Sequence, residues 1–313
     1  MAFEIKNTPI LHFEEIAIFN SISKTCIKIL TKGAILNHWL TPYSDTTLDI
    51  MDGNTFDGTW NGFEQNGFKG GKMSPFSCRL KEGKYSINDT TYCIEKFYLD
   101  KHAIHGIIYD AVYQIKNIET SDNATIVKLQ FDYQGTDKGY PFPFFILVSY
   151  TLTSDDKVIV STTIINKSNQ IIPLMDGWHP YFKLDKKVDS LELTFQNQGK
   201  VVYDNELIPT GNFIKDDQFD HGKALGSMHL DDCYQLKEHA KLILKGKQIY
   251  LEMTPLKNYP YLQLYTPNHR QSIAIENLSG IPNCFNNKIG LQNLKPNEEI
   301  EFITQFKTFQ VSL

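Results

Sequence analysis

The sequence has few cysteines and no arrangement of them that suggests a cross-link or a metal centre. Its five cysteines include no CxxC pair and no Cys/His pattern at zinc-finger spacing, so a zinc finger is excluded. We expect reduced structural thiols, since a free cysteine usually behaves as a small buried hydrophobic residue. No neighbouring residue supplies an obvious base to activate one of them as a nucleophile. These cysteines are Cys26, Cys78, Cys93, Cys233 and Cys284.

An excess of charge of one sign and long apolar runs are also missing. The formal net charge is -5 over 313 residues, with acidic and basic side chains mixed along the chain, which argues against a nucleic-acid partner. No apolar run approaches the roughly 20 residues that span a bilayer. The segment 1–6 is too polar for a secretory signal. We therefore expect a cytoplasmic protein with no membrane partner.

Linkers, repeats and long amphipathic helices are scarce as well. No Pro/Gly/Ser-rich segment or charge block divides the chain, so one domain over residues 1–313 is favoured over two. A propeller is the least favoured all-β architecture because no 40-residue blade repeat is present. Two large packed sheets or a closed barrel would leave few unpaired edge strands among so many strands.

What the sequence does contain is a series of short β-branched and aromatic runs bounded by Asn, Asp, Gly, Ser and Pro. Such runs are typical of strands and turns. In 126–133, apolar side chains alternate with mostly polar ones, as in a half-buried antiparallel strand. Residues 154–156, Ser-Asp-Asp, predict a hairpin loop. The expected strands are 26–30, 125–133, 144–153, 157–166, 190–195, 241–245, 248–254, 261–266, 272–277 and 299–309.

Two segments carry groups suited to proton transfer. The segment 177–182 reads Gly-Trp-His-Pro-Tyr-Phe and fixes His179 between a proline and aromatic residues, where an imidazole can exchange protons. Glu276 follows Ile273-Ala274-Ile275 and precedes a Pro/Asn-rich loop. A carboxyl group after such an apolar run is a candidate for a raised pKa, although an ordinary glutamate at a sheet edge fits the pattern equally well.

Other segments carry candidate ligand-binding groups. Arg79, in a Pro-led extended segment, offers a rigid fork of donors for sugar hydroxyls or an anion, or is simply solvated. His105 precedes Gly106, which lets the backbone approach closely and leaves space beside the imidazole, although an ordinary hydrogen-bonded histidine fits the pattern at least as well. The pair Asp231-Asp232 marks a solvated turn or, with His229, a metal ligand, but one such pair without further spaced ligands is poor evidence for a metal.

These segments occur in one order along the chain. In sequence they are Arg79 followed by Gly83-Lys84-Tyr85, Ile104-His105-Gly106, the 177–182 segment, Leu230-Asp231, Leu264-Tyr265-Thr266, and Glu276 followed by Pro282-Asn283-Cys284-Phe285-Asn286. Their order and spacing resemble the aldose 1-epimerase (galactose mutarotase) family from about Gly33 to the C-terminal strand. The chain is similar to a less characterised bacterial branch with a Pro-Asn-Ala-Phe-Asn segment after the glutamate, so the resemblance leaves the sugar open.

The resemblance implies a fold and a set of roles. The fold is a large single-domain β-sandwich, all-β, with an open cleft across one sheet. By resemblance, Glu276 is the catalytic base, His179 the catalytic acid and His105 a second active-site histidine. Arg79 and Asp231 would hold sugar hydroxyls, with Asp232 as the alternative to Asp231. The aromatic faces of Trp178, Tyr181, Phe182 and Tyr265 are candidates for stacking against a pyranose, or for the core.

The reaction implied is anomer interconversion of an aldohexose or related monosaccharide. Glu276 as carboxylate would remove the anomeric hydroxyl proton while His179 as imidazolium protonates the ring oxygen. No metal, cofactor or covalent intermediate is required, and a monomer or homodimer is expected. Three alternatives remain open: a hexose-6-phosphate 1-epimerase using Arg79, Lys72 or Arg270; a non-catalytic sugar-binding protein; and a glycosidase pairing Glu276 with Asp231 or Asp232.

Overall fold

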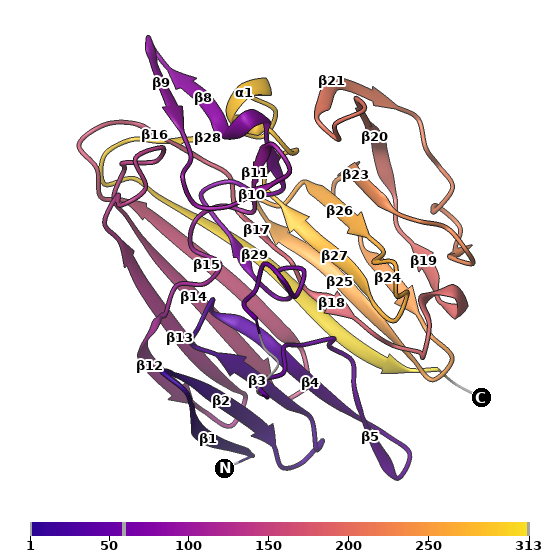
Figure 1. The fold of residues 1–313 in the computed structure, drawn as a ribbon. Coiled ribbons are helices and arrows are strands. Elements are labelled where there is room, and N and C mark those ends of the chain that lie inside the picture. Colours follow the sequence, from indigo (N-terminus) through magenta and orange to yellow (C-terminus); the bar gives the residue numbers. More distant parts are fainter. Residues whose placement is uncertain (1, 58–60, 312–313) are drawn as a thin grey trace.

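The computed structural model describes residues 2–57 and 61–311, which form two large antiparallel sheets and several smaller ones (Figure 1). The largest sheet consists, in spatial order, of β12 (Gln114–Thr120), β13 (Ala124–Tyr133), β14 (Phe144–Thr153), β15 (Val158–Asn166), β29 (Glu299–Gln310), β25 (Ile249–Lys257), β24 (Leu242–Lys245), β19 (Glu192–Thr194) and β22 (Lys223–Ala224). Its long central strands alternate buried and half-buried residues, because one face packs on the core.

The second large sheet, the cavity sheet, carries most of the residues considered below. Its strands, in spatial order, are β21 (Pro209–Ile214), β20 (Asn197–Tyr203), β23 (Asp231–Leu236), β26 (Tyr261–Tyr265), β27 (Ile273–Leu278), β17 (Gly177–Trp178) and β6 (Lys72–Met73). β18 (Tyr181–Phe182) also pairs with β27. All six residues of β27 are buried, as expected for a strand covered on both faces.

Smaller sheets surround this pair. The N-terminal sheet contains β1 (Phe3–Ile10), β2 (Phe13–Asn20), β3 (Cys26–Leu30), β4 (Ile35–Tyr43) and β5 (Thr46–Asp49). β10 (Tyr98–Leu99), β11 (His102–Ile104) and β7 (Arg79–Leu80) form another, and two pairs join β16 (Ile172–Leu174) to β28 (Gln292–Leu294) and β8 (Lys84–Ile87) to β9 (Thr90–Cys93). The helices are short: η1 (Lys81–Gly83), η2 (Val188–Ser190) and α1 (Cys284–Asn287). Within the described ranges, none has the length and apolarity to cross a membrane.

The expected all-β sandwich is confirmed. Every expected strand is present, with ends that differ by a few residues, and the 154–156 hairpin joins β14 to β15. Other strands were not predicted. β1 is one of these: apart from its first residue it is largely exposed, so it has no apolar face to reveal it. Glu276 lies within β27 rather than at its end.

Aromatic side chains join the two large sheets. Trp178 of β17 and Phe182 of β18 both pack against Phe306 of β29, with ring centroids 5.4 and 5.8 Å apart. Tyr259 packs against Phe302 in the same way. One continuous hydrophobic cluster therefore runs between the cavity sheet and the largest sheet.

A fully buried ion pair lies under the cavity sheet. Nζ of Lys72 lies 2.7 Å from a carboxylate oxygen of Asp176, and neither side chain has exposed surface. Tyr259 and Ser74 each donate a hydrogen bond of 2.6 Å to the same carboxylate. The backbone N–H of Asp176 donates to Ser279 Oγ. Because Asp176 precedes Gly177, this network fixes the start of the segment that carries His179.

Candidate active site

A cavity of about 240 Å³ opens on the outer face of the cavity sheet. Ligand pockets for drug-sized molecules usually start near 300 Å³, so this one suits a small ligand. The cavity sheet contributes mainly polar side chains, whereas the apolar lining residues come from loops and from the small sheet of β7, β10 and β11. The lining residues are Glu64, Gly67, Phe68, Cys78, Arg79, Leu99, Ile104, His105, His179, Tyr181, Tyr203, Leu207, Asp231, Gln263, Tyr265, Glu276 and Pro282.

Strand register places several of these side chains in rows on one face. Gln263 of β26 stands opposite Glu276 of β27, and Asp231 of β23 stands opposite Tyr265 of β26. Residues two apart on a strand share a face, so Gln263 and Tyr265 both point into the cavity. The antiparallel pairing thus brings together residues that are far apart in the sequence.

His179 and Glu276 meet inside the cavity. The Nε2 atom of His179 lies 3.4 Å from Oε1 of Glu276, and both side chains are almost completely buried. Burial, followed by the negative charge of Asp231, raises the pKa of Glu276 well above its usual range. Burial lowers the pKa of His179 to about 3. Burial therefore favours the neutral form of both groups in the free protein, with the proton on the carboxyl group and none on the imidazole.

The raised pKa of Glu276 agrees with the expectation from the sequence. The imidazolium expected at His179 during the reaction is not the form that burial favours in the free protein. The reason is desolvation, since a site this dry disfavours the charged form of both groups. Sequence alone does not reveal that depth of burial.

His105 stands beside His179. Their rings meet edge to face with centroids 4.9 Å apart, and the ring of Phe68 also meets that of His105, with centroids 4.7 Å apart. Burial, then His179 and Arg79, lower the pKa of His105 well below its usual range. The Nδ1 atoms of both histidines are buried without a hydrogen-bond partner. Such unsatisfied atoms are typical of a site that a polar ligand completes.

The backbone around His105 is tightly constrained. His105 has a φ of 60° and Gly106 a φ of 76°, both in the left-handed region. A Cβ atom on Gly106 would lie 2.2 Å from the carbonyl oxygen of Ser74, so only glycine permits this close approach. The expected function of Gly106 in allowing close backbone packing is confirmed.

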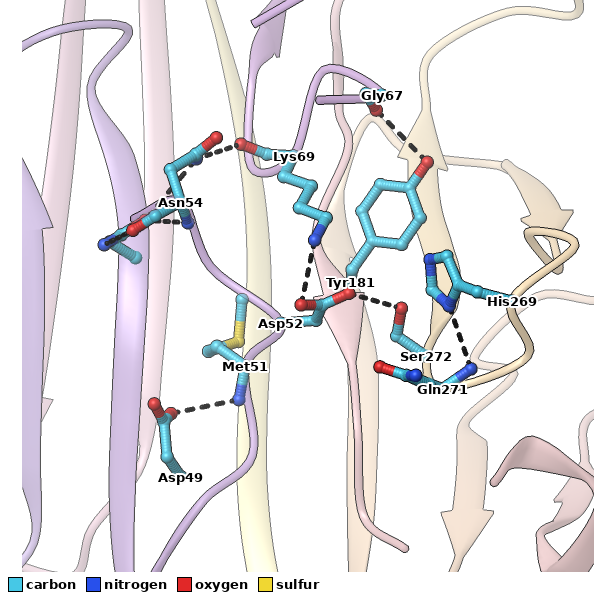
Figure 2. A network of polar contacts seen from close by, with 11 residues as sticks. Asp49, Met51, Asp52, Asn54, Gly67, Lys69, Tyr181, His269, Gln271 and Ser272 are labelled. Atoms are coloured by element: carbon cyan, nitrogen blue, oxygen red, sulfur yellow. Dashed lines mark hydrogen bonds and ion pairs between the residues drawn. The ribbon is translucent and has the colours of Figure 1, made fainter. Parts of the chain in front are cut away.

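The ring of Tyr181 also packs against His179. The two rings stack with centroids 4.9 Å apart and an interplanar angle of 11°. The Tyr181 hydroxyl donates a hydrogen bond of 3.1 Å to the carbonyl oxygen of Gly67, as Figure 2 shows. This contact ties the ring to the loop that also brings Phe68 to the cavity wall.

An acidic residue fastens that loop to the cavity sheet. In Figure 2, the carboxylate of Asp52 accepts hydrogen bonds from Lys69 at 2.9 Å and from Ser272 at 2.6 Å. Burial opposes ionisation of Asp52, but these two hydrogen bonds and the Lys69 charge give a net lowering of its pKa. The backbone N–H of Asp52 also donates to the carbonyl oxygen of Tyr181. The wall beside His179 is thus held by charge-assisted hydrogen bonds.

Arg79 and Asp231 form the polar end of the cavity. Their nearest charged atoms are 3.9 Å apart. Gln263 Nε2 donates to Asp231 Oδ1 at 2.8 Å, and the Tyr203 hydroxyl donates to Gln263 Oε1 at 3.2 Å. Asp232 instead pairs with Lys200 at 2.7 Å and does not line the cavity. Of the two aspartates, only Asp231 lies where it can meet a ligand.

Several residues named from the sequence lie elsewhere. Trp178 is buried in the core and donates its indole N–H to the carbonyl oxygen of Gly70, so the stacking role expected for it is wrong. Phe182 is likewise a core residue. Successive residues of an extended chain point to opposite faces, so Trp178 enters the core while His179 enters the cavity. Tyr181 and Tyr265, by contrast, do line the cavity.

Lys72 and Arg270, the other cationic residues that the sequence offers for binding a sugar phosphate, also lie away from the cavity. Lys72 is held by Asp176 beneath the sheet. Arg270 donates to Asp189 and to the carbonyl oxygens of Met228 and Gly226. Among the described residues that line the cavity, only Arg79 has a permanent positive charge. Across residues 2–57 and 61–311, no group of three or more His, Cys, Asp or Glu side chains has an arrangement that would hold a metal.

Sequence reasoning missed some of the lining residues. Gln263 was recoverable, because it lies two residues before Tyr265 on an alternating strand. Glu64 and Leu207 come from loops, where no periodic pattern indicates direction. Cys78 was identified only as a structural thiol, yet it reaches Glu276.

Comparison with known proteins bears on this arrangement. The family model for aldose 1-epimerase matches residues 16–307. The chain belongs to the aldose 1-epimerase family. It is 25% identical over 229 residues to the uncharacterised protein YihR of Escherichia coli, covering 70% of this chain and 72% of that protein. It is 27% identical over 206 residues to an aldose 1-epimerase of Streptococcus thermophilus, covering 61% of this chain and 56% of that protein.

A protein of known structure shares the fold. A galactose mutarotase-like protein of Clostridium acetobutylicum superposes with a TM-score of 0.86 at 18% identity, covering 99% of each chain. An identity this low establishes the fold alone. The family membership and the fold expected from the sequence are both confirmed.

Proposed function

We propose that this protein is an aldose 1-epimerase that interconverts the α and β anomers of a neutral monosaccharide. The observation that carries the proposal is the His179–Glu276 pair, 3.4 Å apart and buried at the centre of the cavity in a member of this family. Anomer interconversion needs one group that accepts a proton and one that donates a proton on the same small molecule. In the proposed mechanism this pair shares one proton between its two sites.

The proposed reaction starts with the shared proton on Glu276, where burial favours it. Transfer from Glu276 to His179 over 3.4 Å gives a carboxylate and an imidazolium. Glu276 then takes the anomeric hydroxyl proton, the C1–O5 bond breaks, and the ring oxygen takes the proton from His179. The products are the open-chain aldehyde, protonated Glu276 and neutral His179. Rotation about C1–C2 and the reverse transfers close the other anomer.

Burial favours one stage of this sequence. The protonation state left after ring opening is the neutral pair that desolvation favours in the free protein. Burial therefore opposes the first proton transfer, from Glu276 to His179, and favours the later transfers with the sugar that restore the neutral pair. His105 and Arg79 are proposed to bind the sugar oxygens nearest the reacting atoms, with Asp231 and Gln263 binding hydroxyls further along.

The lining charges favour a neutral sugar over a phosphorylated one. Glu64 and Asp231 face the same cavity as the single guanidinium of Arg79, which already lies 3.9 Å from Asp231, and Glu276 becomes a carboxylate during the proposed reaction. A phosphate would add nearly two negative charges to this set. The described cavity wall offers it no second permanent cation, because Lys72 and Arg270 are bound elsewhere.

We expect neutral α-hexoses to be equilibrated faster than their 6-phosphates, by about 100-fold or more in kcat/KM, since discrimination of about 3 kcal/mol is typical of a mispaired charge. Polarimetry of freshly dissolved glucose, galactose and glucose 6-phosphate measures this. Equal or higher kcat/KM for the phosphate would contradict the assigned substrate class. No acceleration with any aldose would contradict the function itself.

Neither of the remaining alternatives is favoured by the geometry. A glycosidase would place a second carboxylate across the scissile bond from Glu276. Here His179 is the proton-exchanging group within 3.4 Å of Glu276, while Asp231 is engaged by Gln263 and faces Arg79. A protein that only binds sugars would not need a shared proton at the centre of its cavity.

A further inference from the structure

The thiol of Cys78 reaches the carboxyl group of Glu276. Sγ of Cys78 lies 3.9 Å from Oε2 of Glu276, in the orientation of an S–H donor to a carboxylate. His179 faces the other oxygen, Oε1. The two oxygens of Glu276 are therefore divided between a histidine and a thiol, and both partners lie in the cavity wall.

The backbone conformation at Cys78 directs its thiol toward Glu276. Cys78 has a φ of 53°, in the left-handed region that residues with a side chain rarely adopt. Its carbonyl oxygen accepts a hydrogen bond of 3.1 Å from the backbone N–H of His105, which has the same unusual conformation. Strained conformations of this kind persist where the surrounding structure fixes them and are concentrated at functional sites.

The surroundings also keep the thiol protonated. Burial, then the charges of Glu276 and Cys233, raise the pKa of Cys78 well above its usual value. A thiol in this state is a donor and a poor nucleophile. The site thus contains a proton that Cys78 does not give up, directed at the oxygen of Glu276 that His179 does not face.

We propose that Cys78 is a positioning residue that fixes the orientation of the Glu276 carboxyl group and stabilises its ionised form. The inference deepens the proposed function, on which it rests. An S–H···O contact favours the carboxylate over the neutral acid, and so it opposes the effect of burial. It thereby eases transfer of the shared proton from Glu276 to His179, the step that must precede abstraction of the anomeric proton.

A matched pair of substitutions separates the donor from the volume of the side chain. Cys78→Ala removes the donor, whereas Cys78→Ser replaces the thiol with a hydroxyl donor. Cys26→Ala is the control, because Cys26 is a half-buried thiol of β3 outside the cavity. Circular dichroism and thermal unfolding of each variant establish that the protein compared is folded.

The first readout is the pKa of Glu276. It is measured by carbon-13 NMR of the glutamate side chains, and the Glu276→Gln variant identifies the resonance. We expect Cys78→Ala to raise this pKa by about 0.5 units, the size of a weak hydrogen bond. Cys78→Ser should leave it at or below the wild-type value, and Cys26→Ala should not change it. An unchanged or lowered pKa in folded Cys78→Ala overturns the proposal.

The second readout is turnover. A 0.5-unit shift corresponds to an about threefold lower kcat for Cys78→Ala, with little change in KM and recovery in Cys78→Ser. The alkaline limb of the pH profile should move upward with the pKa of Glu276. If the pKa shifts but kcat does not, Cys78 has no positioning role in turnover. If the wild type does not catalyse anomerisation, the proposed function is wrong. The NMR titration then still shows whether Cys78 stabilises the ionised form of Glu276.

Discussion

Glu276→Gln should lower kcat for anomerisation by about 10²–10⁴-fold, the usual contribution of a general acid–base group. Glutamine retains the shape of the side chain and its contacts with His179 and Cys78 but cannot accept the anomeric proton. Proton NMR of freshly dissolved α-glucose and α-galactose gives the rate at which each β-anomer forms. The wild-type protein and the variant are compared at equal concentration.

The matched control is Glu299→Gln, at an exposed glutamate that begins β29. It should leave the rate unchanged. Folding should not account for a loss in Glu276→Gln, because the folded-state pKa of Glu276 is raised above its unfolded value. The wild-type free energy of unfolding therefore falls as pH rises from the unfolded-state pKa of Glu276 to its folded-state pKa. In this pH range the glutamine variant should be at least as stable as the wild type. A variant that keeps more than about a tenth of the wild-type rate would contradict the assignment of Glu276.

Asp176→Asn should lower the free energy of unfolding by about 3–5 kcal/mol, the usual effect of breaking a buried ion pair. The substitution leaves the ammonium group of Lys72 fully buried without its counter-charge. Tyr259 and Ser74 would also lose the carboxylate to which they donate. Urea-induced unfolding followed by tryptophan fluorescence measures the change.

An exposed pair provides the comparison for this stability effect. Asp217 lies 2.8 Å from Lys215 with both side chains largely in solvent. Asp217→Asn should change stability by no more than about 0.5 kcal/mol, because exposed pairs contribute little. A loss below about 1 kcal/mol in Asp176→Asn would show that the buried pair does not fix the start of the segment that carries His179.

The strands that sequence predicted are those with large alternating side chains. β14 and β3 have the predicted bounds, because each alternates buried with less buried residues between clear turns. β1 was missed because its exposed face leaves no apolar pattern. β17 and β18 are too short for any periodicity to appear. Tertiary pairing with β27, and not local propensity, makes them strands.

The sequence could predict which residues form the site, but not their protonation states or the directions of their side chains. The motifs around His179, Glu276, Arg79 and Asp231 were recognisable in chain order, and the fold gathers all four residues in one cavity. Their assigned roles remain predictions. The core position of Trp178 depends on which face of the sheet its side chain takes, which a single motif does not specify.

Long-range pairing explains the other differences. Lys72 resembles a free cation in the sequence because its partner, Asp176, lies 104 residues away. The neutral state of His179 follows from burial by the cavity sheet and by the loop that Asp52 fastens. Neither burial nor partner can be read from residues adjacent in the chain.

The central claim is that His179 and Glu276 act as one unit around a shared proton. The most direct test is the rate of anomerisation of α-glucose by Glu276→Gln, His179→Asn and the double variant. Groups that act together lose their function together, so the double variant should be no slower than the slower single variant, within about threefold. Losses that multiply, or single variants as fast as the wild type, would contradict the claim.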